Sequence, residues 1–171
     1  SDSNNCVNLY HKNHLNGDPD TEFCWRFHGK MMSHTVEISS ICFSNSLDEN
    51  DQLRLFSIGK DRRCFEYNVS NASMSHGLPV EHVFSLEKEA FPTACIWYPS
   101  NLDSKEGLIL TANNEYKMKL WSPTTKSSRR TCLGPTYGGE ITKLKLLNQH
   151  GLREGKQYLL YQTSKKVIGL I

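Results

Sequence analysis

The chain has 171 residues, of which 37% are hydrophobic, 22% charged and 10% aromatic. This composition supports a packed core and argues against a disordered chain. The formal net charge of +2 is too small to indicate nucleic acid or another polyanion as a partner. No apolar run approaches the roughly 20 residues of a membrane span, and the polar start lacks the apolar centre of a signal peptide. We therefore expect no nucleic-acid partner and no membrane partner.

Short runs rich in β-branched and aromatic residues, bounded by polar or glycine-containing turns, follow one another along the chain. This pattern is typical of short β-strands, and no long window has the apolar periodicity of a helix. The sequence therefore predicts an all-β fold. The expected strands are 38–43, 53–58, 64–69, 82–86, 94–98, 108–112, 118–121, 141–147, 158–162 and 167–171.

Two segments repeat without gaps at an offset of 54 residues, Ser57–Tyr67 and Thr111–Trp121. Each begins with a hydroxyl residue, has an acid four positions later, and ends on an aromatic residue six positions beyond the acid. A weaker third copy covers 158–171, with a Lys165-Lys166 turn. A period near 50 residues with strand-like content is close to that of a propeller blade, about 40–50 residues, and far from that of helical repeats.

The first copy resembles a WD repeat, the unit of a large β-propeller family. Ser33-His34 stands where that family has Gly-His, Asp61 stands in the turn, and Tyr67 stands at the Trp position. The resemblance implies a structural hydrogen-bond relay through His34, Ser57, Asp61 and Tyr67. Such a relay is physically reasonable, because each buried polar group gains a partner in it.

The second copy departs further from the family. Thr111, Glu115 and Trp121 imply a weaker second relay, since no histidine precedes Ala94. The third copy has no tryptophan. Another propeller type and a β-sandwich remain the alternative folds.

These observations predict part of a WD-repeat β-propeller, about three four-stranded blades in an incomplete ring. Closed propellers need about four to eight blades, so the functional unit is expected to be larger than this chain. The expected divisions are a loop over 1–20, the outer strand of a preceding blade over 21–33, blades over 34–89 and 90–132, and a partial blade over 133–171.

A closer resemblance rests on four segments, Ser57–Arg62, Leu110–Trp121, Leu133–Gly139 and Lys166–Ile171. They resemble axonemal WD-repeat proteins of the calmodulin- and spoke-associated complex at the radial-spoke base, over roughly residues 25–171. The resemblance implies a non-catalytic scaffold of the cilium or flagellum axoneme, in the cytoplasm and cytoskeleton, that supports ciliary and sperm motility. The alternative is a cytosolic or nuclear WD-repeat adaptor or substrate receptor of a multiprotein complex.

Competing chemistry has little support in the sequence. The nearest approach to a metal site is His11-x-x-His14 with Cys6, but structural zinc sites need four well-spaced ligands. No nucleophile elbow, P-loop or His-Glu-x-x-His motif occurs, and the glycine-containing stretch 134–139 leads into a strand-like run rather than a helix. We expect no enzyme activity, no catalytic residue, no metal, no cofactor and no small-molecule substrate. Cys42, Cys64 and Cys95 are expected to be buried thiols.

The candidate partner contacts are two turns, Arg62-Arg63 and Tyr116-Lys117. Turns between strands lie on one face of a propeller, loops commonly carry function, and arginine is favoured at interfaces. The competing interpretation is that both turns are simply solvated. The partners would be protein subunits of a large assembly. Trp25 and Trp97 are both expected in the core.

Overall fold

The computed structural model describes residues 4–14, 23–44, 53–98, 107–147 and 158–171. In these ranges the chain forms β-strands and no α-helix, so the described part contains no helix that could cross a lipid bilayer. The all-β prediction is confirmed.

The strands form four separate antiparallel sheets. The first blade is the sheet of β3 (Ile38–Phe43), β4 (Arg54–Gly59), β5 (Arg63–Asn68) and β6 (Val80–Ser85). The second blade is the sheet of β7 (Pro92–Tyr98), β8 (Leu108–Asn113), β9 (Lys117–Ser122) and β10 (Ser127–Leu133). The third blade has three strands, β11 (Ile141–Leu147), β12 (Tyr158–Thr163) and β13 (Ile168–Leu170). A two-stranded ribbon of β1 (Cys6–His14) and β2 (Phe23–Met32) precedes them.

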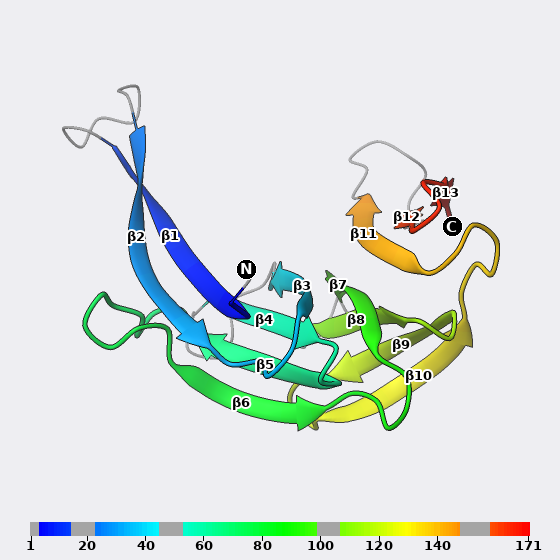
Figure 1. The fold of residues 1–171 in the computed structure, drawn as a ribbon, viewed down its shortest axis with the longest axis horizontal. Coiled ribbons are helices and arrows are strands. Elements are labelled where there is room, and N and C mark those ends of the chain that lie inside the picture. The colour runs from blue at the N-terminus through cyan, green and yellow to red at the C-terminus, as the bar shows by residue number, and fades with distance from the viewer. Residues whose placement is uncertain (1–3, 15–22, 45–52, 99–106, 148–157) are drawn as a thin grey trace.

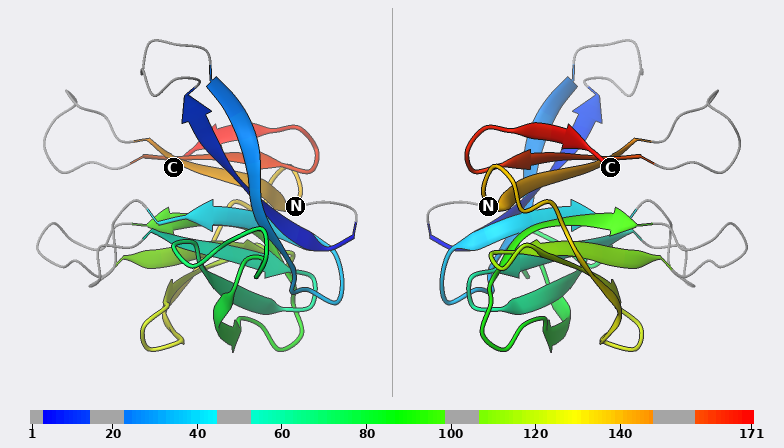
Figure 2. Two further views of the ribbon diagram at one scale, coloured as in Figure 1. Left: turned by 90° about the vertical axis from the view of Figure 1, so that its left-hand side faces the viewer. Right: turned by 90° about the vertical axis from the view of Figure 1, so that its right-hand side faces the viewer.

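The sheets follow one another around an open arc (Figures 1 and 2). The inner strands contact each other in chain order, β3 with β7 and β7 with β11, while β6 and β10 lie at the outer rim. Each blade runs from its inner to its outer strand as a meander. This is the arrangement of β-propeller blades. The fold is therefore part of a β-propeller with an incomplete ring, as predicted.

The first and second blades bury both of their faces against neighbouring sheets, which explains why their central strands read as continuous apolar runs. The core between the first two blades includes Phe56, Ile58, Trp97 and Trp121, with the Phe56 and Trp97 rings stacked at 5.7 Å. Successive residues of a strand point to opposite faces. Leu55, next to Phe56, accordingly packs on the other side of the first blade with the β1–β2 ribbon.

Two expectations about the N-terminal ribbon were wrong. Residues 6–14, expected within a loop, form β1, in which Val7 and Leu9 are buried. A strand is present within the predicted range 21–33 as β2, paired with β1. Trp25 on it is 64% exposed, whereas Trp97 is in the core as expected. Trp25 belongs to a ribbon that projects from the body of the molecule (Figure 1), so it has no described sheet to pack against.

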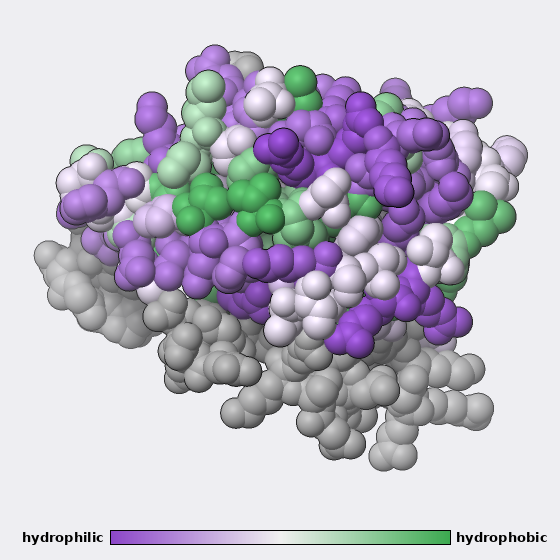
Figure 3. All heavy atoms as spheres, turned by 90° about the horizontal axis from the view of Figure 1, so that it is seen from below, coloured by the Kyte–Doolittle hydropathy of each residue, from purple (hydrophilic) through white to green (hydrophobic). Residues whose placement is uncertain are grey.

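The outer rim of the blades is polar. β10, which the sequence did not predict, exposes every one of its residues. Seen from below, this rim is mostly hydrophilic around a smaller apolar patch (Figure 3). β10 is therefore held by its ladder with β9 rather than by an apolar face.

Three cysteine side chains meet where the first two blades join. Cys64 and Cys95 are buried core residues, and Cys42 packs against the same core. A hydrogen bond between the Cys42 and Cys95 thiols, together with burial, raises the pKa of Cys42 well above its usual value. Burial is the main cause that raises the pKa of Cys64. Because the thiolate is the reactive form, the raised pKa values make the Cys42 and Cys64 thiols less reactive.

Candidate functional site at the turn end of the blades

One end of the blades, here called the turn end, carries the β4–β5, β8–β9 and β12–β13 turns. The three turns have the same backbone form. The third turn residue has a positive φ, and its amide donates a hydrogen bond to the carbonyl three residues earlier. These residues are Arg62 (67°, 2.9 Å), Tyr116 (59°, 3.2 Å) and Lys166 (62°, 3.1 Å). The predicted third repeat therefore has the same turn geometry as the first two.

The structure brings the four predicted relay residues of the first blade together. His34 Nδ1 lies 2.9 Å from Asp61 Oδ1, and His34 Nε2 lies 2.7 Å from Ser57 Oγ. Ser57 Oγ lies 2.7 Å from the Tyr67 hydroxyl. Since an ionised carboxylate only accepts, His34 Nδ1 donates to Asp61. In the neutral imidazole that donates from Nδ1, Nε2 accepts from Ser57, and Ser57 then accepts from Tyr67.

The relay continues one residue further than the sequence indicated. The Ser33 hydroxyl lies 2.5 Å from the Tyr67 hydroxyl, so Tyr67 is held from two sides. Burial raises the pKa of Tyr67, and the hydrogen bonds with Ser33 and Ser57 offset part of that rise. The neutral phenol therefore suits this position. The WD-repeat family has a glycine at the position of Ser33, and a glycine offers no side chain, so the family pattern contains no signal for this contact.

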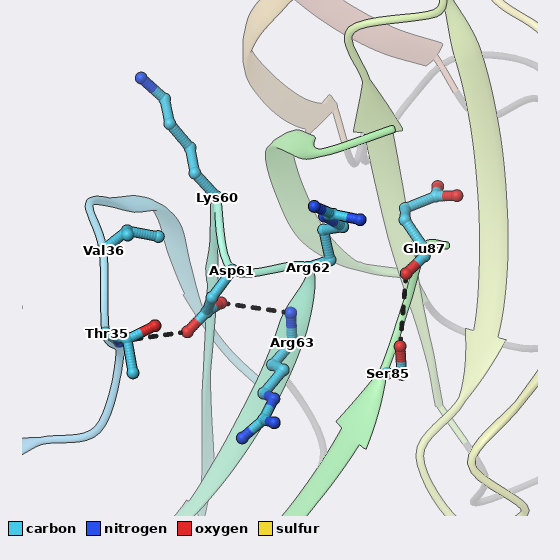
Figure 4. A pocket seen from close by; sticks show the side chains of 8 residues that line it. All are labelled: Thr35, Val36, Lys60, Asp61, Arg62, Arg63, Ser85 and Glu87. Atoms are coloured by element: carbon cyan, nitrogen blue, oxygen red, sulfur yellow. Dashed lines mark hydrogen bonds between the residues drawn. The ribbon is translucent and has the colours of Figure 1, made fainter. Parts of the chain in front are cut away.

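Asp61 also fixes the backbone around the relay. Its Oδ1 accepts from the Arg63 amide at 3.2 Å and its Oδ2 from the Thr35 amide at 3.3 Å (Figure 4). Together with His34, these donors occupy both carboxylate oxygens. The Asp61 side chain thus joins the β4–β5 turn to the segment before β3, and its role is structural.

The second relay is present only in part. The Trp121 indole donates to Thr111 Oγ1 at 3.2 Å. Glu115 does not join them, which corrects the prediction: its carboxylate lies 2.7 Å from Lys117 Nζ, and both side chains are close to half exposed. The Lys117 ammonium is the main cause that lowers the pKa of Glu115. Lys117, a candidate partner contact, is thereby engaged in a local ion pair.

Asn113 has the turn-holding role that was expected of Glu115. Its Oδ1 accepts from the amides of Glu115 at 3.1 Å and Lys117 at 3.0 Å. Its Nδ2 donates to Glu87 Oε1 at 3.0 Å, and Lys119 Nζ lies 2.5 Å from Glu87 Oε2. Glu87 lies in the segment between β6 and β7, so this buried network ties that segment to β8 and β9.

A single position explains why the two blades differ. Gly59 in the first blade is equivalent to Asn113 in the second, each being three residues before the positive-φ residue. A Cβ on Gly59 would lie 2.4 Å from His34 Nδ1 and 3.0 Å from Asp61 Oδ1. The imidazole therefore occupies the space that a side chain would need. The second blade has no such histidine, and the Asn113 side chain occupies the equivalent space.

A polar cavity of about 510 Å³ opens beside the β4–β5 turn (Figure 4). Three of its lining residues are cations, and its two acids are Asp61 and Glu87, whose oxygens are already engaged. Arg62 Nη1 donates to the Lys88 carbonyl, and Lys60 Nζ lies 2.7 Å from Glu37. The lining residues are Thr35, Val36, Lys60, Asp61, Arg62, Arg63, Ser85 and Glu87.

Of the other predicted contacts, Tyr116 is half-buried and Arg62 and Arg63 are exposed. Within the described ranges, no group of three or more His, Cys, Asp or Glu side chains is placed to hold a metal ion. The His11 ring instead packs edge-on against His28 at 4.9 Å. Arg54 and Glu66 form a further ion pair at 2.5 Å inside the first blade.

The comparisons with known proteins bear on identity and on fold separately. No family model matches the chain. The chain is 41% identical, over 192 aligned residues, to cilia- and flagella-associated protein 251 of Tetrahymena thermophila, covering 99% of the chain and 19% of the relative. It is 38% identical over 144 residues to the protein of the same name in Mus musculus, covering 84% of the chain and 11% of the relative. The chain therefore spans about a fifth or less of the length of these relatives.

Solved structures resemble the chain in fold alone. A chain of an active polycomb repressive complex 2 in the basal state has a TM-score of 0.61 and 14% identity, covering 96% of this chain and 30% of that one. A chain of the Chaetomium thermophilum complex bound to GSK126 has a TM-score of 0.59 and 14% identity, covering 81% and 29%. In both cases the match uses about a third or less of the solved chain.

Proposed function

We propose that this chain is part of a WD-repeat propeller that acts as a non-catalytic protein-interaction scaffold in the axoneme of a motile cilium or flagellum. The observation that carries the proposal is the 41% identity, over nearly the whole chain, to a cilia- and flagella-associated protein. The finer proposal is a position at the radial-spoke base, within the calmodulin- and spoke-associated complex, in support of ciliary and sperm motility. The protein would belong to the cytoskeleton of the cilium.

The geometry of the turn end supports a scaffold role. A buried hydrogen-bond relay that fixes the turn engages the polar groups that could carry chemistry, namely His34, Ser57 and Asp61. Their arrangement also follows the pattern that WD repeats use, with Tyr67 at the tryptophan position. A site whose histidine and aspartate hold the backbone presents rigid loop tips to partners.

The alternative is an adaptor or substrate receptor of a cytosolic or nuclear complex. The fold suits it equally, because one fold serves many functions. What favours the ciliary proposal is sequence similarity at 41% and 38% to proteins named for cilia and flagella, against 14% to chains of a polycomb complex.

The test is fractionation of the intact protein, tagged at its own locus in a ciliated cell. We expect it to stay with demembranated axonemes and to be released only by high salt, together with radial-spoke subunits. Recovery in a soluble complex, with none in axonemes, would contradict the proposal and favour the adaptor. Loss of the protein should reduce beat frequency while cilium length stays unchanged.

A further inference from the structure

We propose that the cavity beside the β4–β5 turn binds a carboxylate-rich segment of a partner protein, with Arg62 and Arg63 as its anchors. The proposal rests on the scaffold role above and adds to it the chemistry of one partner. Four features of the cavity carry the inference: a rigid rim, internally satisfied acids, guanidinium groups without acidic partners, and nearby acids that disfavour a polyanion.

The rim is held in place before any partner arrives. Arg62 has a φ of 67° and its amide donates to the Gly59 carbonyl. The Arg63 amide donates to Asp61, which is itself fixed by buried His34. Side chains on such a turn lose little backbone freedom on binding, which favours affinity.

The acids of the cavity are not available to neutralise the arginines. Asp61 accepts from the His34 ring and from the Thr35 and Arg63 amides. Glu87 is 9% exposed and accepts from Asn113 and Lys119 on the second blade. Both carboxylates are therefore held by partners within the fold, which leaves the arginines of the lining with little local compensation.

Neither arginine has a carboxylate partner among the described residues. Arg62 uses one donor on the Lys88 carbonyl, and a guanidinium has five. Lys60 pairs with Glu37, but their side chains are 46% and 68% exposed, so this pair is weak and can exchange for a ligand. Guanidinium groups bind carboxylates through two parallel hydrogen bonds, which makes carboxylate the matching ligand.

The surroundings select a short acidic segment over nucleic acid. Glu37 and Glu140 lie close enough to affect Lys60, and Glu115, Glu87 and Glu89 lie close enough to affect Lys117. A polyanion with a charge on every backbone unit would meet these acids as well. One or two glutamate or aspartate side chains bound at the arginines would bring far fewer negative charges near these acids than a nucleic acid would.

The experiment measures fluorescence anisotropy of a labelled peptide of alternating Glu and Ser with the intact protein. A peptide of alternating Gln and Ser is the uncharged control. We expect the Glu peptide alone to bind, and the double variant Arg62→Gln/Arg63→Gln to weaken it at least about tenfold, as the loss of charge-assisted hydrogen bonds requires.

A matched variant separates the site from bulk charge. Arg129 and Arg130 lie next to each other on β10 and are exposed, so Arg129→Gln/Arg130→Gln removes the same charge elsewhere. We expect its affinity to stay within about twofold of the unchanged protein. Arg63→Gln alone leaves the Arg62–Lys88 contact in place and should still weaken binding. This single variant therefore tests the site even if the double variant folds poorly.

Several outcomes would overturn the proposal. These are equal binding of the Glu and Gln peptides, no binding of the Glu peptide, or equal losses in the two double variants. Binding of a phosphoserine peptide without binding of the Glu peptide would also overturn it, and would assign the cavity to phosphate. The axonemal fractionation is independent: a protein absent from axonemes that still binds through Arg62 and Arg63 loses the proposed function but keeps this inference.

Discussion

The first and second blades build the same turn with different chemistry. In the first, an imidazole stands over Gly59 and connects Asp61 to Ser57 and Tyr67. In the second, Asn113 supplies its own side chain and reaches outward to Glu87. The difference shows that the backbone form, with a positive φ at the third turn residue, is what the repeats share. Different sets of polar side chains can stabilise this same backbone form.

The largest effect is expected from His34→Ala, which removes the residue that distinguishes the turn of the first blade from that of the second. The change leaves Ser57 and Asp61 short of a buried partner and opens a cavity, so we expect a local destabilisation of about 3 to 4 kcal/mol. Hydrogen exchange on the intact protein should show lost protection in β4 and β5 and little change in β8 and β9. His76→Ala, in an exposed loop, is the control, and equal effects of both changes would contradict the relay.

Gly59→Ala tests the proposed exchange between glycine and asparagine. Its Cβ would displace buried His34, so we expect a destabilisation of about 2 kcal/mol, which is typical of overpacking. In a His34→Ala background the same change should cost much less, because only the contact with Asp61 Oδ1 at 3.0 Å then remains. Additive losses in the double variant would show that the imidazole is not what excludes a side chain at this position.

Tyr67→Phe removes the hydroxyl that Ser33 and Ser57 share, and we expect a loss of about 1 to 2 kcal/mol at neutral pH. Because the pKa of Tyr67 is raised in the folded state, the stabilisation that depends on the neutral phenol is fully present below the ordinary tyrosine value of 10.0. It is lost as the pH rises above that value. Hydrogen exchange between neutral and alkaline pH should show a smaller loss of protection in β4 and β5 for Tyr67→Phe than for the unchanged protein.

The smallest expected effect belongs to Glu115→Gln, which sharpens the comparison with Asp61→Asn. Glu115 pairs with Lys117 at the surface, where ion pairs contribute little. We expect no measurable change in protection of β8 and β9 for Glu115→Gln, but clear loss in β4 and β5 for Asp61→Asn. A comparable loss of protection in both variants would show that Glu115 has a role equivalent to that of Asp61.

Apolar patterning was enough to predict the inner and central strands, since residues such as Phe56 and Ile109 are fully buried in short runs between turns. It could not reveal β10, whose Ser128, Arg130 and neighbours are exposed throughout, because such a strand is defined by its hydrogen-bond ladder. β1 was missed for a related reason: His11 and Lys12 interrupt its apolar alternation, and its strand form depends on pairing with β2.

The relay of the first blade could be predicted because its spacing matches a known repeat. The network around Asn113 could not, because it joins residues from the β6–β7 segment, β8 and β9 that have no shared motif. Alignment placed Glu115 opposite Asp61 correctly along the chain, but it could not show that the Asn113 amide is nearer to the turn amides. That choice is settled by side-chain geometry.

The rate at which buried thiols at the junction of the first two blades are alkylated reports how often those blades separate. Cys64 of the first blade and Cys95 of the second are buried at this junction, whereas Cys42 beside them is partly exposed. An alkylating reagent therefore reaches Cys64 and Cys95 only when those blades separate. Exposed Cys132 and partly exposed Cys24 and Cys42 should be modified first. These three and Cys6, which is buried in β1, are replaced beforehand. The slow phase that remains would then time blade separation in the protein.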